Sequence, residues 1–216
     1  MSKSRFSAAD LEKIKAAVAA AEGHTSGEIV PYYVERSDDY DEAVWRSGVF
    51  FGAAALLVFY VIRTFTPIWL PFGLTQTLFI ILLAAGIGTA LAFWLPPLRR
   101  IFAGNYLLKR RVAARALEAF VSEEVFQTRD RTGILIFISL FERRVQVIGD
   151  SGINARVTPG DWEDVVEIIV NGIKSGQAAE GLIRAIEKCG DLLKTKEVQR
   201  RVDDSNELSD SLRIGE

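Results

Sequence analysis

Two long apolar runs divide the polar sequence of this chain into an N-terminal and a C-terminal part. They are Gly48–Ile62 (GVFFGAAALLVFYVI) and Leu78–Leu95 (LFIILLAAGIGTALAFWL), and Arg63 is the single charged residue within and between them. A helix of roughly 20 apolar residues spans the hydrocarbon core of a bilayer. The pattern therefore predicts a transmembrane helical hairpin, with helices at about 45–65 and 75–95.

Prolines and a glycine separate the two runs, and aromatic and basic residues flank them. Pro and Gly favour a tight connection between the helices. Trp and Tyr are enriched at membrane–water interfaces, and an Arg near a helix end can reach the lipid headgroups. Interfacial positions are predicted for Trp45, Arg63, Trp69, Trp94, Arg99 and Arg100. The alternative is a hairpin buried in a large soluble core, where two successive runs this apolar are rare.

Lysine and arginine are distributed unevenly around the predicted hairpin. The connection from Thr64 to Thr77 has neither residue, whereas Arg36 and Arg46 precede the first helix and a basic cluster from Arg99 to Arg115 follows the second. By the positive-inside rule, both flanks lie in the cytoplasm. We therefore expect a two-pass protein of the cell inner membrane, with both termini cytoplasmic and the lipid bilayer as a partner. The basic cluster acts either only as this topological signal or also as a contact for anionic lipid headgroups.

The polar sequence on both sides of the hairpin has the periodicities of helices and strands. Apolar residues three and four positions apart predict helices, and short runs rich in branched residues predict strands. Pro31 lies in the first predicted strand and indicates a sheet edge or a bulge, because it cannot donate a ladder hydrogen bond. The predicted elements are a helix from Ser7 to Gly23, a strand Glu28–Glu35, the hairpin, a helix Asn105–Gln127, strands Gly133–Ser139 and Arg143–Gly149, and helices at about 158–176 and 179–193.

This order of elements predicts the fold class and the domain organisation. We expect an α/β protein, a small α/β/α sandwich in which helices cover a mixed sheet of three or more strands, with the two-helix transmembrane hairpin inserted into it. Residues 1–43 then form the N-terminal part of the domain, residues 44–98 the hairpin and residues 99–195 the C-terminal part. Residues 196–216 are expected to be a mobile polar tail, because charge rises and large apolar residues become few.

Charge and cysteine content narrow the possible functions. The chain has 216 residues and a net charge of −2, which does not favour nucleic-acid binding. Cys189 is the only cysteine, so the chain has no internal disulfide and no cysteine-based metal site. This content suits a reducing compartment.

Two stretches resemble the TPM-domain family. Thr25–Glu28 (TSGE), followed by a predicted strand, resembles the start of the family's first strand. Thr128–Ile153 (TRDRTGILIFISLFERRVQVIGDSGI) resembles its paired central strands and the Gly-Asp loop after them. The second match is fairly specific, because a long apolar strand, an ERR turn and a GDxGI loop occur in that order. With the helices at both ends, the resemblance covers nearly all of the polar sequence.

The resemblance implies a compact α/β/α domain that is usually tethered to a membrane. Some family members are acid phosphatases, some bind calcium or other divalent cations, and plant relatives take part in photosystem repair. The better-known members have an uninterrupted, exported domain. Here the predicted hairpin interrupts the domain after its first strand, and the charge distribution keeps the domain inside the cell. Both differences weaken the transfer of an activity to this chain.

Asp150 is the strongest candidate for chemistry. It comes after a predicted strand and lies beside Gly149 and Gly152, where the backbone can bend around a ligand. Strand ends are favoured binding places in open sheets. A hard cation such as Ca²⁺ or Mg²⁺ needs several oxygen ligands, and Asp150, Glu28 and loop carbonyls can supply some of them. The alternatives are that Asp-Ser-Gly is an ordinary turn and that Glu28 is only a strand-end acid.

Other polar residues give weaker signals. Arg143 and Arg144 lie in the predicted turn between two strands, where they either contact a phosphate or lipid head or are simply solvated. His24, the only histidine, is not surrounded by the pattern of a phosphatase or a zinc site. Cys189 lacks the phosphate-binding loop of cysteine phosphatases. The sequence has no P-loop, dinucleotide fingerprint or HExxH motif.

Two functions fit these observations. The first is a membrane-anchored interaction or accessory module that presents its domain at the cytoplasmic membrane face to another membrane protein or to a second copy of itself. The second is a divalent-cation-dependent phosphatase with its site near Asp150. The sequence favours the first, because it groups few side chains of catalytic type and assigns no catalytic residue.

Overall fold

A computed structural model describes residues 6–65, 73–196, 198, 200 and 206–215 of the chain. The chain forms two compact units, one from residues 1–37 and 111–216 and the other from residues 38–110. The elements are α1 (Ala8–Glu22), β1 (Glu28–Val34), α2 (Asp41–Phe65), α3 (Leu74–Trp94), α4 (Pro96–Ser122), β2 (Gly133–Ser139), β3 (Arg144–Gly149), α5 (Ser151–Asn154), a 3₁₀ helix η1 (Pro159–Trp162), α6 (Glu163–Lys174), α7 (Ala178–Thr195) and β4 (Arg213–Gly215).

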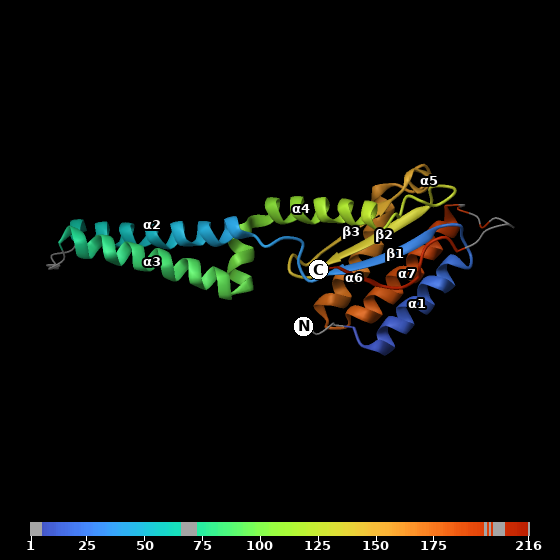
Figure 1. Cartoon of the computed structure of the whole chain (residues 1–216), viewed down its shortest axis with the longest axis horizontal. Helices are drawn as coiled ribbons and strands as arrows, with labels where there is room; N and C mark the ends of the chain where they lie inside the picture. The colour runs from blue at the N-terminus through green and yellow to red at the C-terminus, as the bar shows by residue number, and fades with distance from the viewer. Residues whose placement is uncertain (1–5, 66–72, 197, 199, 201–205, 216) are drawn as a thin grey trace. The chain divides into compact units, whose positions relative to one another are not determined.

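The four described strands form one mixed sheet in the order β3-β2-β1-β4. β1 runs parallel to β2 along its whole length, from Glu28 opposite Gly133 to Val34 opposite Ser139. It is also parallel to β4, whereas β3 is antiparallel to β2. The expected mixed sheet is therefore confirmed. Figure 1 shows β1 and β2 side by side, although the hairpin separates them in the sequence.

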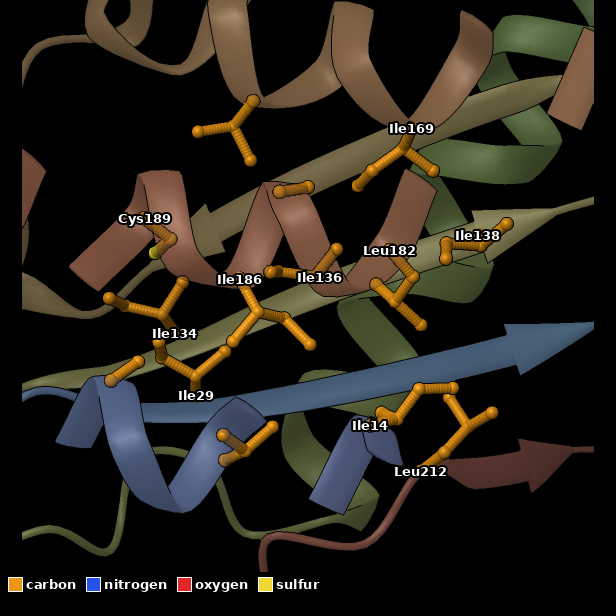
Figure 2. Packing of buried hydrophobic residues seen from close by; sticks show 14 of the residues in the cluster. Ile14, Ile29, Ile134, Ile136, Ile138, Ile169, Leu182, Ile186, Cys189 and Leu212 are labelled. Carbon is orange, nitrogen blue, oxygen red and sulfur yellow. The ribbon is translucent and has the colours of Figure 1, made fainter. Parts of the chain in front are cut away.

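Alternate residues of β1 and β2 face two separate apolar clusters, as the period of two in a strand requires. On one face, Ile29 and Ile134 pack in a cluster with α1, α6 and α7, as Figure 2 shows. On the other face, Val30 and Leu135 pack with the part of α4 from Val112 to Phe120. Because both faces are covered, β1 and β2 are apolar at most positions. This arrangement confirms the expected α/β/α sandwich.

β1 contains a proline although it lies between two other strands. Backbone N–H groups of successive strand residues point to opposite sides. The N–H of Ile29 points away from β2, because it donates to Glu22 Oε1 at 2.7 Å. Pro31 lies two residues further on, so its nitrogen is on the same side, and β4 pairs with β1 only from Tyr32 onward. The proline therefore lies at a locally open edge, in agreement with the edge that the sequence indicates.

The C-terminal segment differs from the expected mobile tail. Arg213–Gly215 form β4 beside the end of β1, and Leu212 is buried in the apolar core. The amides of Glu207 and Leu208 donate to the carboxylate of Glu28 at 3.4 and 3.3 Å. The sequence did not reveal this strand for two physical reasons. A strand of three residues is too short to have a detectable period, and its partner is distant in the sequence.

α2 and α3 form an antiparallel pair within the second unit. Their 25 and 21 residues correspond to lengths of about 37 and about 31 Å. Both helices are long and apolar enough to span a membrane. Two observations show that they pack closely. Ser47 Oγ donates to the carbonyl oxygen of Gly88 at 2.9 Å. The Phe51 side chain lies so near Gly88 that an added Cβ would be only 2.7 Å from it. The predicted hairpin is thus present as two packed helices, and α2 begins at Asp41, a few residues before the expected start.

The division of the α/β unit across the sequence leads to a first prediction. Replacing residues 38–110 with a flexible Gly-Ser linker should give a soluble protein that unfolds cooperatively in urea, because β1 keeps its pairing with β2 and β4. The fragment from Arg111 onward should not fold, because it lacks the buried Ile29 and Val30 that fill both faces of the sheet. Circular dichroism and urea titration measure both. Equal free energies of unfolding for the fragment and the linked protein would show that the domain is not split.

Candidate functional site

Asp150 lies directly after β3 and caps the short helix α5. Its Oδ1 accepts a hydrogen bond from the Ser151 amide at 2.6 Å, and its Oδ2 lies 2.9 Å from Nε of Arg131. The Arg131 guanidinium also lies over the ring of Phe126, 5.6 Å from its centroid. The Asp150 side chain is only 6% exposed. Both carboxylate oxygens therefore stabilise the loop itself, one as a helix cap and the other in an ion pair.

Close packing also explains why position 152, the second glycine of GDSGI, has no side chain. The Gly152 amide donates to the carbonyl oxygen of Arg131 at 2.9 Å. A Cβ at position 152 would clash with the carbonyl oxygens of Asp130 and Arg131. Close approach of two backbone segments explains this glycine without a ligand. The geometry supports the turn alternative for Asp150.

Glu28 lies at the same end of the sheet as Asp150. It is opposite Gly133 of β2, and the Asp150 amide donates to the Gly133 carbonyl at 2.9 Å. The Glu28 carboxylate is 4% exposed and accepts the amides of the C-terminal segment. Among the described residues, no group of three or more His, Cys, Asp or Glu side chains can hold a metal ion. A hard cation takes about six or more oxygens, whereas the oxygens of Asp150 and Glu28 already have partners within the protein. The expected ligation of Ca²⁺ or Mg²⁺ by these two acids is left to a titration, described below.

Arg99, one of the predicted interfacial residues, closes the end of α3. Its Nη2 donates to the carbonyl oxygen of Phe93 at 2.6 Å and its Nε to that of Ala92 at 3.2 Å. The guanidinium carbon also lies 5.5 Å from the centroid of the Phe93 ring. The last carbonyls of a helix have no partner within the helix. Arg99 satisfies two of them.

The other predicted interfacial residues that the structure describes lie near helix ends. Trp45 in the first part of α2 and Trp94 at the end of α3 are 70% and 77% exposed. Because the two helices are antiparallel, these tryptophans belong to the same end of the pair. Arg63 is exposed in the last turn of α2, and Arg100 is half-buried. Trp69 lies outside the described residues.

The carboxyl ends of β1 and β2 hold a buried polar network that sequence reasoning missed. The Ser139 hydroxyl donates to Glu142 Oε2, and Ser37 Oγ lies 2.8 Å from Ser139 Oγ. The Ser37 amide donates to Glu142 Oε1 at 2.9 Å. Ser139 and Glu142 are 0% and 2% exposed, so they hold the chain together rather than meet a substrate. The sequence feature that could have indicated this network is Glu142, an acid that follows two apolar residues between two predicted strands.

Cys189 is fully buried in α7, where desolvation raises the pKa of its thiol to about 12. The thiolate is the nucleophilic form, so this cysteine is inert at neutral pH. The single histidine, His24, is exposed in the turn after α1.

Glu22 is a half-buried acid, with one buried carboxyl oxygen, that the sequence did not mark. It lies at the end of α1 and accepts the N–H of Ile29, while its Oε2 is buried and has no hydrogen-bond partner among the described residues. Burial raises the pKa of Glu22 to about 8, although the Ile29 amide lowers it, and the negative charges of Glu28 and Asp210 raise it further. Arg213 is nearby and lowers it. The carboxyl is therefore largely protonated near neutral pH.

The raised pKa of Glu22 gives a second prediction. Between pH 4.5, its ordinary pKa, and about pH 8, the folded state keeps a proton that the unfolded chain releases. The free energy of unfolding should therefore fall as pH rises through this window. Glu22→Gln should flatten the pH dependence and stabilise the domain above pH 8, since the amide oxygen can still accept the Ile29 N–H. Urea unfolding of the linked protein at several pH values measures this.

The matched control for this prediction is Glu12→Gln, an exposed glutamate on the same helix. It should leave the pH dependence as in the wild type. The same slope for Glu22→Gln and the wild type would contradict the proposed protonation.

Comparison with known proteins supports the fold and the family resemblance. Residues 107–192 match the family model of the TPM domain. The NMR structure of the BA42 protein from the psychrophilic bacterium Bizionia argentinensis is similar over 100% of this chain and 99% of that chain, with a TM-score of 0.61 and 20% sequence identity. No curated protein matches the sequence.

These matches confirm the resemblance that the sequence indicated. The range from 107 to 192 begins within α4 and ends within α7, so it contains β2, β3 and the Asp150 loop but neither β1 nor the hairpin. At 20% identity, the likeness to the BA42 protein shows the fold alone.

Proposed function

We propose that this chain, which carries a TPM domain at residues 107–192, is a membrane-tethered accessory protein. In this proposal α2 and α3 cross the cell inner membrane, and the α/β domain lies at its cytoplasmic face. There it contacts another membrane protein or a second copy of the chain. Nucleic acid has no part in this function.

The apolar surface of the two long helices carries the proposal. Large side chains along both helices are exposed, among them Leu57 at 61%, Phe79 at 65% and Leu82 at 70%. Leaving a Leu or Phe side chain in water costs roughly 1.5–3 kcal/mol relative to burial. Contiguous apolar surface of this kind is rare on soluble monomers. Lipid acyl chains are the cover that fits two helices of this length.

The distribution of charge supports the orientation. Positive residues lie after α3 in a cluster from Arg99 to Arg115, whereas the connection between the helices has no Lys or Arg. Translocation of such a cluster is disfavoured, so this side stays in the cytoplasm. The parallel pairing of β1 with β2 agrees, since it requires the segments before and after the hairpin to be on one side.

An accessory role is favoured over catalysis because acids at both ends of the sheet are used within the domain. Asp150 pairs with Arg131, and Glu142 binds Ser37 and Ser139. The alternative, a divalent-cation-dependent phosphatase near Asp150, would need these contacts to open. It has the family resemblance in its favour but not this geometry.

The proposed topology gives a third prediction. Because the native thiol of Cys189 is buried, a cysteine introduced elsewhere is the only one that reacts. A membrane-impermeant maleimide added to spheroplasts should label Gly73→Cys, which lies between the two spans. It should label Lys15→Cys, on the exposed side of α1, only after the membrane is permeabilised. Labelling of Lys15→Cys in sealed spheroplasts would overturn the cytoplasmic placement.

The alternative function leads to a fourth prediction. A ligand that binds only the native state, present at a hundred-fold excess over its dissociation constant, stabilises it by about 2.7 kcal/mol. From the contacts of Asp150, we expect millimolar Ca²⁺ or Mg²⁺ to leave the unfolding midpoint of the linked protein unchanged, and turnover of a generic phosphomonoester to be absent. An upward shift that Asp150→Asn abolishes, with Glu28→Gln reducing it, would favour the phosphatase. Asn can still cap α5, so this variant tests the charge rather than the fold.

A further inference from the structure

A recess opens beside the turn between β2 and β3. Leu140 and Arg143 of the turn line one part of it, and Val170, Ile173 and Lys174 of α6 line the other. Its volume is about 240 Å³, below the roughly 300–1,000 Å³ of sites for drug-sized ligands. The recess therefore suits a small head group with a few carbon atoms rather than a nucleotide or a large cofactor.

The two sides of the recess differ in chemistry. Leu140 and Ile173 are partly buried and pack against the main apolar core, so they form a fixed apolar floor. Arg143 and Lys174 are exposed and provide two positive charges from different elements. None of the five lining residues is acidic. Within the described part of the chain, neither Arg143 nor Lys174 has an ion-pair partner.

The backbone at Arg143 has a positive φ, as it has at Tyr40, Glu124 and Arg131. Its φ is 53°, in the left-handed region that favours Gly, Asn or Asp, and its amide donates to the carbonyl oxygen of Leu140 at 3.0 Å. A non-glycine residue adopts this conformation uncommonly. Here it places a long cationic side chain in the turn that lines the recess.

We propose that this recess binds the phosphate group of a small organic phosphate, with Arg143 and Lys174 on the phosphate oxygens and Leu140 and Ile173 against the adjoining carbon atoms. A guanidinium presents paired N–H donors that match phosphate geometry, and a lysine ammonium binds phosphate as a point charge. Two cations from separate elements suit a group with several oxygens. The apolar floor favours an ester over the free inorganic ion.

The charges near the recess do not cancel those of Arg143 and Lys174. Lys174 lies in the last turn of α6, where the helix dipole attracts a cation and offsets part of its charge. Glu142, the nearest acid in sequence to Arg143, is buried and bonded to Ser37 and Ser139.

A lipid headgroup and a soluble phosphate ester share this chemistry, and the experiment separates them. The full chain is purified in an uncharged detergent with labelled Ile, Leu and Val methyl groups. It is titrated with dihexanoyl phosphatidic acid, with glycerol phosphate and with dihexanoylglycerol, which has no phosphate. We expect saturable NMR shifts of the Leu140, Val170 and Ile173 methyl groups with the phosphate-bearing ligands. Tighter binding of the phosphatidic acid identifies a lipid headgroup, and equal binding identifies a soluble ester.

Two variants test the cations and one controls for net charge. Arg143→Asn keeps a residue that tolerates positive φ, and Lys174→Gln removes the second charge. Each should weaken phosphate binding about ten-fold, the effect of one lost charge-assisted hydrogen bond. Lys15→Gln removes an exposed charge from α1 and should bind as the wild type does. Unchanged affinity in both recess variants, or equal shifts with dihexanoylglycerol, would overturn the proposal. It does not depend on the proposed topology, which the maleimide experiment tests separately.

Discussion

The parallel pairing of β1 with β2 is the constraint on which the rest of this structure depends. It aligns Glu28–Val34 with Gly133–Ser139, two segments that the apolar hairpin separates in the sequence. Both segments must lie on the same side of any membrane that the hairpin enters. An insertion of one spanning helix would place them on opposite sides, whereas two helices return the chain to its starting side. A sheet that is split in this way is therefore compatible with an insertion of two spanning helices but not with an insertion of one.

The place of the insertion also has a physical basis. The chain leaves the α/β unit just after β1, where the Ser37 amide binds Glu142 and the Leu140 amide binds the carbonyl of Val34. These contacts fix the end of β1 against the β2–β3 turn without any contribution from the hairpin. A loop at the end of a strand tolerates long insertions, because its own backbone groups reach solvent or side chains. The α/β unit can thus keep its sheet while the hairpin interrupts its sequence.

The sequence predicted the parts of this fold that depend on local patterns. α1 begins beside Ser7, where the sequence placed the helix, with Ser7 and Asp10 in a capping box, and the apolar runs form two packed helices. It could not predict β4, because a three-residue strand is specified by a distant partner. Arg99 was expected near the membrane, but its bonds to the end of α3 depend on a turn of the chain. Lys174 lines a recess only because α6 lies beside the β2–β3 turn.

The acids at the amino ends of β1 and β2 show why a site is harder to predict than a fold. Glu22 accepts the amide of Ile29, Glu28 accepts amides of the C-terminal segment, and Asp150 accepts the amide of Ser151. These amides lie at the start of a strand or helix, or in the irregular segment before β4. A buried amide without a partner costs stability. A carboxylate that satisfies such a donor and one that binds a cation look alike in a sequence, because both use the same oxygens. Only the tertiary structure shows which partner those oxygens have.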